Sequence, residues 1–148
     1  MSLSEIRSAI CEILSSVSGV ENVYPYLRWS TDWKAFFDLF RRSDGSAGGW
    51  MVTRSSTGEE RAETAYVFRR HEFRMFGFLR LNDAQQSELA FQDQVEAICD
   101  AFRSNYSLNG TALNSGPISV DTVENRMFGS VLVHWAELTL PVLERRPW

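Results

Sequence analysis

The chain has 148 residues, of which 44% are hydrophobic, and this suits one domain that buries about two thirds of its unfolded surface. The 19 acidic residues outnumber the 15 basic ones and give a net charge of -4, which argues against a dedicated nucleic-acid binder, because such proteins usually carry a cationic excess. Cys11 and Cys99 are too far apart in sequence to indicate a metal site or a short disulfide loop, so we expect free thiols in a reducing compartment.

The N-terminal segment predicts an amphipathic helix over residues 3–17. Apolar residues recur there at steps of three and four and form one stripe: Leu3, Ile6, Ile10, Ile13, Leu14 and Val17. Ser2 or Ser4 can cap this helix, and Gly19 can end it. The same segment carries acidic residues and no long apolar run, so we expect no secretory signal and a soluble, cytoplasmic protein.

A short extended piece and a short helix follow. Residues 23–27 contain apolar side chains interrupted by Pro25, and a proline inside an extended segment favours the edge of a sheet. The next segment predicts a helix whose cap is Ser30, Thr31 or Asp32. Its aromatic residues fall at helical spacing: Trp33, Phe36, Phe37 and Phe40.

Residues 42–65 form the clearest interruption of the hydrophobic pattern. The stretch "RRSDGSAGGW" is rich in glycine and serine, "WMVTRSS" predicts a strand, and "TGEERAETA" reads as a polar, charged loop. We therefore expect a flexible loop or hairpin at about 42–65, mobile in a free monomer and ordered against a partner.

The stretch "YVFRRHEFRMFGFLRLND" predicts a long strand over residues 65–81 because its side chains alternate with a period of two. One face carries the apolar residues Phe73, Met75, Gly77, Leu79 and Leu81. The other face carries Arg70, Glu72 and Arg74, followed by Phe76 and Phe78. The charged row is either a solvated strand face with weak ion pairs or a subunit contact, since the two phenylalanines would otherwise expose apolar surface.

The C-terminal half predicts one long helix and two strands. Asn82 or Asp83 is expected to cap the helix. Its buried stripe consists of Phe91, Val95, Ile98, Cys99, Phe102 and Tyr106. Two strands then flank Gly129, and the second is apolar on both faces, so we expect it to be central. The sequence therefore predicts one α+β domain, residues 1–148, with an antiparallel or mixed sheet of about four to five strands and two main helices on one face.

Residues that could carry chemistry are few. His134 is either a core histidine with a satisfied ring or a general base. His71 and Glu72 are neighbours on one strand and point to opposite faces, so they do not form a catalytic pair. The sequence contains no serine-nucleophile turn, phosphate-binding loop or dinucleotide fingerprint. We expect no enzymatic activity, no cofactor and no metal. Exposed aromatics and arginines could indicate RNA stacking, but the acidic balance argues against it.

Three segments together carry a family resemblance. "RWSTDWKAFFDLFRRSDGSAGGWMVTR", "HEFRMFGFLRLNDAQQSELAFQDQVEAICDAFR" and "ENRMFGSVLVHWAELTLPVLER" resemble, in this order, the tail-terminator and tail-completion proteins of tailed bacteriophages. The resemblance covers most of the chain, from about residue 28 to residue 145.

The resemblance implies a structural virion protein at the head-proximal end of the tail, assembled in the host cytoplasm. Such proteins form a ring, usually a hexamer, that caps the tail tube, ends tail growth and offers a surface to neck or connector proteins. DNA would pass through the bore without specific binding, and no membrane is involved. The alternatives are a head-tail connector or neck subunit, and a small nucleic-acid or ligand-binding module.

A ring repeats one heterologous contact, so each subunit needs two complementary patches. Trp and Arg concentrate binding energy at such contacts, and five Trp are present. We expect the outer strand face to contact the adjacent subunit or the terminal tail-tube ring, with Arg70 or Arg74 pairing to an acid of the neighbour. The predicted interface residues are Arg70, Glu72, Arg74, Phe76, Phe78, Glu59, Glu60 and Glu63.

Overall fold

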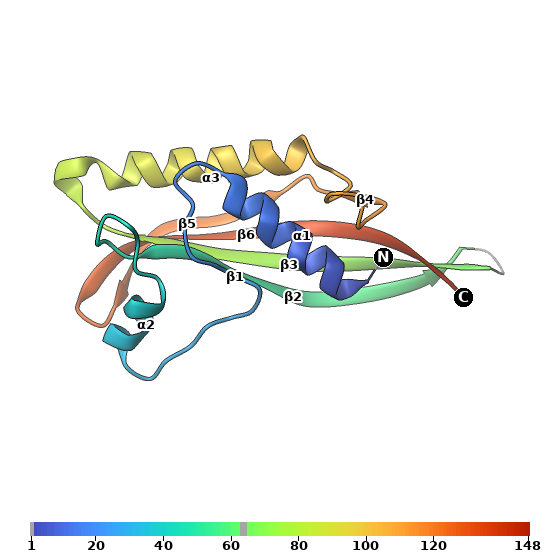
Figure 1. Cartoon of the computed structure of the whole chain (residues 1–148), viewed down its shortest axis with the longest axis horizontal. Coiled ribbons are helices and arrows are strands. Elements are labelled where there is room, and N and C mark those ends of the chain that lie inside the picture. The colour runs from blue at the N-terminus through green and yellow to red at the C-terminus, as the bar shows by residue number, and fades with distance from the viewer. Residues whose placement is uncertain (1, 63–64) are drawn as a thin grey trace.

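The computed structural model describes residues 2–62 and 65–148, and within them it places helices on a six-stranded mixed sheet (Figure 1). The elements are α1 (Leu3–Ser16), β1 (Val23–Tyr24), α2 (Trp33–Leu39), β2 (Gly48–Arg61), β3 (Tyr66–Arg80), the 3₁₀ turn η1 (Asp83–Gln85), α3 (Ser87–Arg103), β4 (Asn114–Ser115), β5 (Ser119–Phe128) and β6 (Val131–Pro147). The predicted α+β class is confirmed. The strand count of four to five is too low, because β4 lies in a run of turn-forming residues without a strand pattern.

The sheet has the order β1-β2-β3-β6, and both β4 and β5 pair with β6. β1 runs parallel to β2, and every other pair is antiparallel. The strand predicted over 65–81 is β3, and β6 is central as predicted, with partners on both of its sides. β1 lies at the edge of the sheet just before Pro25, as the sequence predicts.

The main core lies between one face of the sheet and the two long helices, α1 and α3, which confirms their predicted placement on one face. Ser2 caps α1 by accepting a hydrogen bond from the backbone N–H of Glu5 at 3.1 Å. Trp50 is the largest fully buried side chain, and its indole N–H donates to the side-chain oxygen of Gln94 on α3 at 2.9 Å. This bond lets the polar edge of a large aromatic ring lie inside the core.

The opposite face of the sheet carries a second, smaller core under α2. Asp32 caps α2 through its bond to the backbone N–H of Lys34, at 3.1 Å. The ring centre of Phe36 lies 5.1 Å from that of Phe40 and 5.7 Å from that of Phe78, so the three rings form one aromatic cluster. Phe78 is 1% exposed. The prediction that Phe78 belongs to an intermolecular patch is therefore wrong, because α2 of the same chain covers it.

Residues 57–61 are strand rather than loop, which corrects the sequence prediction for this segment. β2 continues past an irregularity between Arg54 and Ser56 and stays paired with β3 as far as Arg61. The pairing is carried by backbone hydrogen bonds, so it needs no apolar side chains, and a hydrophobic pattern could not reveal it. The expected mobility of this segment in a free monomer stays a prediction.

The start of α3 also differs from the prediction. Asn82 precedes the turn η1, and Asp83 lies inside that turn, so neither caps α3. The chain then passes through Gln86 in the left-handed region, with φ 55°, before the helix begins at Ser87. At the other end, Tyr106 lies beyond the last helical residue and is exposed, so it does not extend the buried stripe.

Candidate interaction surfaces

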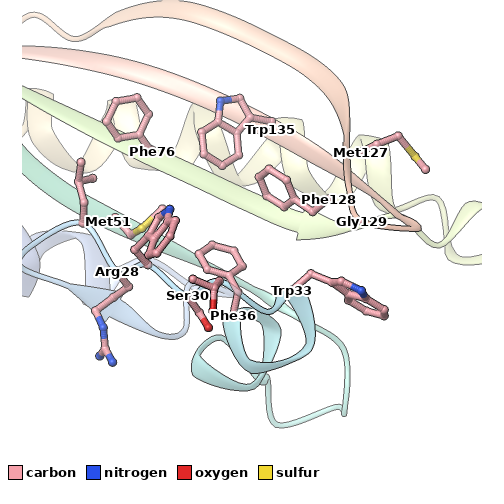
Figure 2. Close-up of a pocket in the computed structure, with 13 residues that line it drawn as sticks. Arg28, Ser30, Trp33, Phe36, Met51, Phe76, Met127, Phe128, Gly129 and Trp135 are labelled. Carbon is pink, nitrogen blue, oxygen red and sulfur yellow. The ribbon is translucent and has the colours of Figure 1, made fainter.

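A groove of about 510 Å³ lies between the segment 27–33, α2 and the sheet face that α2 partly covers. Figure 2 shows Met51, Phe76 and Trp135 on its sheet side, with Met127 and Gly129 at the turn between β5 and β6. We call it the aromatic groove and define it by Leu27, Arg28, Trp29, Ser30, Thr31, Trp33, Phe36, Met51, Phe76, Met127, Phe128, Gly129 and Trp135.

Several apolar side chains of the groove lie in solvent. Trp29 is 78% exposed, Met127 is 57% exposed and Leu27 is 50% exposed. These residues contribute little to the chain's own core, and three large apolar groups gathered around one concave site exceed the scattered exposure that is ordinary for a monomer. The groove therefore has the character of a binding surface.

Cations stack on the aromatic rings of this region. The guanidinium of Arg126 lies 4.6 Å from the ring centre of Trp135, and that of Arg74 lies 5.1 Å from the ring centre of Phe76. The ammonium of Lys34 lies 5.7 Å from the ring centre of Trp33. Such stacking holds positive charges beside apolar surface. A partner that combines apolar side chains with carboxylates would match this chemistry.

The structure places Arg70, Glu72 and Arg74 in a row on the same sheet face as the aromatic groove, as the alternation predicts. Arg70 and Glu72 are exposed, and Arg74 is half-buried. Arg74 lies 3.6 Å from Glu137 on β6 of its own chain, so its charge already has a partner. Phe76 belongs to the groove.

The predicted acidic partners lie on β2, beyond its irregularity. Glu59 and Glu60 are both exposed. Glu59 lies 3.1 Å from the guanidinium of Arg69 on the neighbouring strand β3, so it has an ion pair within its own chain. Glu63 lies outside the described residues.

A buried ionic cluster sits where β2, β3 and β6 run side by side, and the sequence interpretation did not find it. Glu144 is fully buried, and its Oε1 accepts hydrogen bonds from Arg69 at 2.8 Å and from His71 Nε2 at 3.1 Å. The Nε of Arg146 lies 3.0 Å from the same oxygen. The Thr57 hydroxyl donates to Nδ1 of His71 at 2.7 Å. His71 is therefore the neutral Nε2–H tautomer in this network.

The pKa values of this cluster follow from its burial and its charges. Burial raises the pKa of Glu144, but the hydrogen bond from His71 and the charge of Arg146 together lower this pKa by more than burial raises it. The carboxyl therefore stays ionised. Burial lowers the pKa of His71, and Glu144 offsets only part of this effect. The position of Glu144 in the alternation of β6, on the same face as Leu140 and Val142, was the one sequence signal that could have placed it inside.

His134 is a buried histidine with a satisfied ring, as the first of the two sequence interpretations predicts. The Ser87 hydroxyl accepts from the backbone N–H of Asn82 at 2.7 Å and donates to Nε2 of His134 at 2.8 Å. Nδ1–H of His134 then donates to the Asn125 side-chain oxygen at 2.8 Å. Burial lowers the pKa of His134. The order of bonds is that of a nucleophile, a base and an orienting group, but Ser87 is buried and engaged on both sides. The chain of bonds fastens the start of α3 to β6 and β5.

Cys11 and Cys99 are free and half-buried. Burial raises the pKa of Cys11 to about 11 and also raises that of Cys99, so both are thiols rather than thiolates near neutral pH. Residues 2–62 and 65–148 hold no group of three or more His, Cys, Asp or Glu that could bind a metal ion. Nor does any helix in the described part of the chain have the length and apolar character to cross a membrane.

Neither a scan against protein-family models nor a search of the curated proteins finds a match to this chain. Trp29, one of the five Trp that the sequence predicted to lie partly at protein contacts, is exposed at the aromatic groove, and its contact with a partner stays a prediction. The sequence did not indicate that residues 27–33 and the β5–β6 turn would meet at one site, because about 100 residues separate them along the chain.

Proposed function

We propose that this protein is a ring-forming structural subunit of a bacteriophage tail, and that the ring caps the tail tube and provides the surface to which the neck attaches. The observation that carries the proposal is that the two ends of the long strands offer different chemistry. A terminating ring has a different partner above and below it, and the two ends of this subunit suit two such partners.

One end carries the aromatic groove, beside the turn that joins β5 to β6. The other end is formed by residues 57–61 of β2, 66–72 of β3 and 141–147 of β6, which we call the projecting end. Figure 1 shows these strands running on beyond both long helices, toward the C-terminus. Its exposed surface includes the charged side chains of Glu60 and Arg70. The apolar end supports affinity for one partner, and the charged end supports selective contact with another.

The first alternative is a head-tail connector or neck subunit, which would also form a ring and would also need two unlike ends. A ligand-binding module is the second alternative, and the groove favours it in one respect. A volume of about 510 Å³ with apolar walls lies within the range of small-molecule sites. Trp29, which is 78% exposed, argues for a protein partner instead, because small-molecule sites enclose most of the ligand, whereas tryptophans concentrate binding energy at protein interfaces.

The test combines mass with binding. Light scattering and negative-stain images of the purified chain should give rings, and the rings should bind to purified tail tubes and stop their elongation. Trp29→Ala should leave the ring mass unchanged and weaken binding to one axial partner, the tube or the neck, by at least tenfold. The matched control is Tyr106→Ala, which removes another exposed aromatic side chain at the C-terminal side of α3. A monomer at high concentration, without tube binding, would contradict the proposal.

A further inference from the structure

The sheet has two long edges without a neighbouring strand. On one side, β1 covers β2 only at Trp50 and Met51, and among the described residues no strand pairs with the outer edge of β2 from residue 52 to residue 61. On the other side, β5 pairs only with β6. Each edge carries a bulge and charged side chains, which disfavour pairing with arbitrary chains, but neither contains a proline that would remove an outward N–H. Both edges can therefore take a further strand that matches them.

The direction of the strands lets these two edges meet in a rotational repeat. β2 is antiparallel to β3, β3 to β6 and β6 to β5, so β5 runs opposite to β2. Rotation about a ring axis preserves strand direction along that axis, and β5 of one copy beside β2 of the next would therefore be antiparallel. We propose that adjacent subunits join by pairing β5 with the free edge of β2, so that one sheet continues around the ring. This inference rests on the proposed ring function and names its contact.

The backbone groups on the two edges match. Ladder bonds alternate between the two sides of a strand. The N–H of Trp50 donates outward, to the carbonyl of Asn22 at 3.2 Å, and the irregularity after Arg54 shifts this alternation by one, so that Thr57 also directs its N–H outward. On β5, the pairing with β6 leaves the backbone N–H of Val123 on the outer edge of the strand, pointing away from β6. Thr57 and Val123 therefore present outward backbone groups that can pair with each other.

The free edges of β2 and β5 are offset along the strand direction, and this offset determines how far the strands must tilt from the ring axis. The pairing of β5 with β6, of β6 with β3 and of β3 with β2 places Ser119 level with Thr53 of the same chain. The free part of β2, however, continues to residue 61. An offset of about six residues, roughly 20 Å, brings residues 119–127 of β5 beside residues 52–60 of the neighbour. The four strands β2, β3, β6 and β5 together span roughly 19 Å across the sheet. An offset of this length over that width requires the strands to tilt by about 45° from the ring axis, and strands in closed barrels have tilts of this size.

This offset also gives a compatible side-chain register. It sets Val123 opposite Thr57 and Glu124 opposite Ser56. With the extra residue of each irregularity, Ser55 on β2 and Asp121 on β5, left unpaired, no two like charges stand directly opposite each other along the paired segment. Thr57 faces the helix side of the sheet through its bond to His71, and Val123 lines a hollow beside Phe91 of α3 on the same side. The covered face of one copy would thus continue into the covered face of the next.

The first test is a disulfide across the proposed contact. A chain with both Glu124→Cys and Ser56→Cys, mildly oxidised, should yield a ladder of covalent oligomers in non-reducing electrophoresis. Each single variant should give no product beyond a dimer, which also controls for Cys11 and Cys99. The mismatched pair Glu124→Cys with Thr57→Cys, whose side chains lie on opposite faces, should give at least tenfold less ladder. Equal ladders from matched and mismatched pairs would overturn the register.

The second test removes one outward N–H. Val123→Pro should leave the monomer folded, because proline is tolerated on an edge strand, and should reduce ring formation at least tenfold. Val123→Ala keeps the backbone N–H and should form rings at the same protein concentration as the unmodified chain. Circular dichroism and thermal unfolding check the fold of both variants. If the unmodified chain forms rings, Val123→Pro forms them equally well and the matched cysteines do not cross-link, the edge contact is wrong while the ring function stands. If the unmodified chain forms no ring at all, the proposed function itself fails.

Discussion

Gly77 determines how the largest core side chain lies against the sheet. It pairs with Trp50 across β2 and β3, and a Cβ atom at residue 77 would lie only 2.4 Å from Cδ2 and Cε2 of the Trp50 ring. The ring is fully buried and its N–H is bonded to Gln94, so it cannot move aside without losing that bond. The sequence marked Gly77 only as a member of the core face.

We predict that Gly77→Ala lowers the free energy of unfolding by about 3 kcal/mol or more, because overpacking a closed core forces the backbone or the ring to shift. Gly58→Ala is the matched control on the same strand pair, since no atom lies within 4 Å of a Cβ at that residue. We expect Gly58→Ala to change stability by less than about 0.5 kcal/mol. Urea unfolding measures both. Equal effects of the two substitutions would mean that the contact with Trp50 does not set the cost.

The two buried histidines predict a stability that falls in mild acid. Burial lowers the pKa of His71 and of His134 below that of an unfolded histidine, about 6.5. The unfolded chain therefore binds protons first as the pH falls, so stability is full above about pH 7 and is lost below about pH 6.5. Each histidine contributes a slope of at most about 1.4 kcal/mol per pH unit.

His134→Gln should flatten this dependence, because it removes one of the two titrating groups and keeps a polar side chain near Ser87. Chemical unfolding between pH 5 and pH 7.5 measures the slope for the unmodified chain and for the variant. Glu144, whose pKa is lowered, loses its contribution only at more acidic pH, so it does not interfere in this range. An unchanged slope in the variant would contradict a lowered pKa of His134 in the folded protein.

At the scale of elements, the start of α3 depends on one residue in an unfavourable backbone conformation. Gln86 has φ 55° and no side-chain capping bond, yet it directs the chain from η1 into the helix. Non-glycine residues pay roughly 1 kcal/mol in this region, because the Cβ approaches the following carbonyl. The hydrogen bonds of Ser87 with Asn82 and His134 hold the helix start in place despite this cost.

We predict that Gln86→Gly raises the free energy of unfolding by about 0.5 kcal/mol, the relief of strain exceeding the added freedom of the unfolded chain. Gln85→Gly is the control one residue earlier. Gln85 lies in the right-handed turn η1 and is exposed, so the same replacement there should destabilise by about 0.5–1 kcal/mol. Thermal unfolding resolves the sign of each change. A loss of stability in both variants would contradict the proposed strain at residue 86.

At the scale of the whole molecule, the described structure separates a groove end from a projecting end. Arg70 lies at the projecting end, and Arg74 follows on the same face after Glu72. If subunits join through their sheet edges, these residues are left free for an axial partner rather than for the adjacent subunit. The sequence predicted that this strand face contacts either the neighbouring subunit or the tail-tube ring. Edge-to-edge joining of subunits favours the tail-tube ring.

We predict that Arg70→Glu with Arg74→Glu leaves the ring mass unchanged and reduces binding to tail tubes at least tenfold. The cost in stability should be about 1 kcal/mol, since Arg74 loses Glu137, a partly exposed partner at 3.6 Å. Arg103→Glu reverses an exposed charge on α3 and should affect neither ring mass nor tube binding. Normal tube binding by the double variant would leave the charged row as a solvated strand face.

The sequence by itself determined the local elements, because side-chain periodicity and turn chemistry are local properties. The apolar stripe of α1, the alternation of β3 and the apolar faces of β6 all appear in the structure, and Asp32, one of the three predicted candidates, caps α2. The burial of His134 followed from its place in the β6 pattern. Residues 57–61 of β2 form a strand through backbone pairing with β3 and not through burial of apolar side chains. The local pattern therefore predicted a loop for this segment.

Only the tertiary structure decided which surfaces remain available. α2 crosses the sheet and buries Phe78, and strand register brings Arg69 and His71 to Glu144 across distant parts of the chain. The aromatic groove needs residues 27–33 beside the β5–β6 turn. The free edge of β2 exists because β1 pairs with it over only two residues, and β5 has a free edge because, among the described strands, it pairs only with β6. Each of these features depends on contacts between segments far apart in sequence, which side-chain periodicity within one segment does not encode.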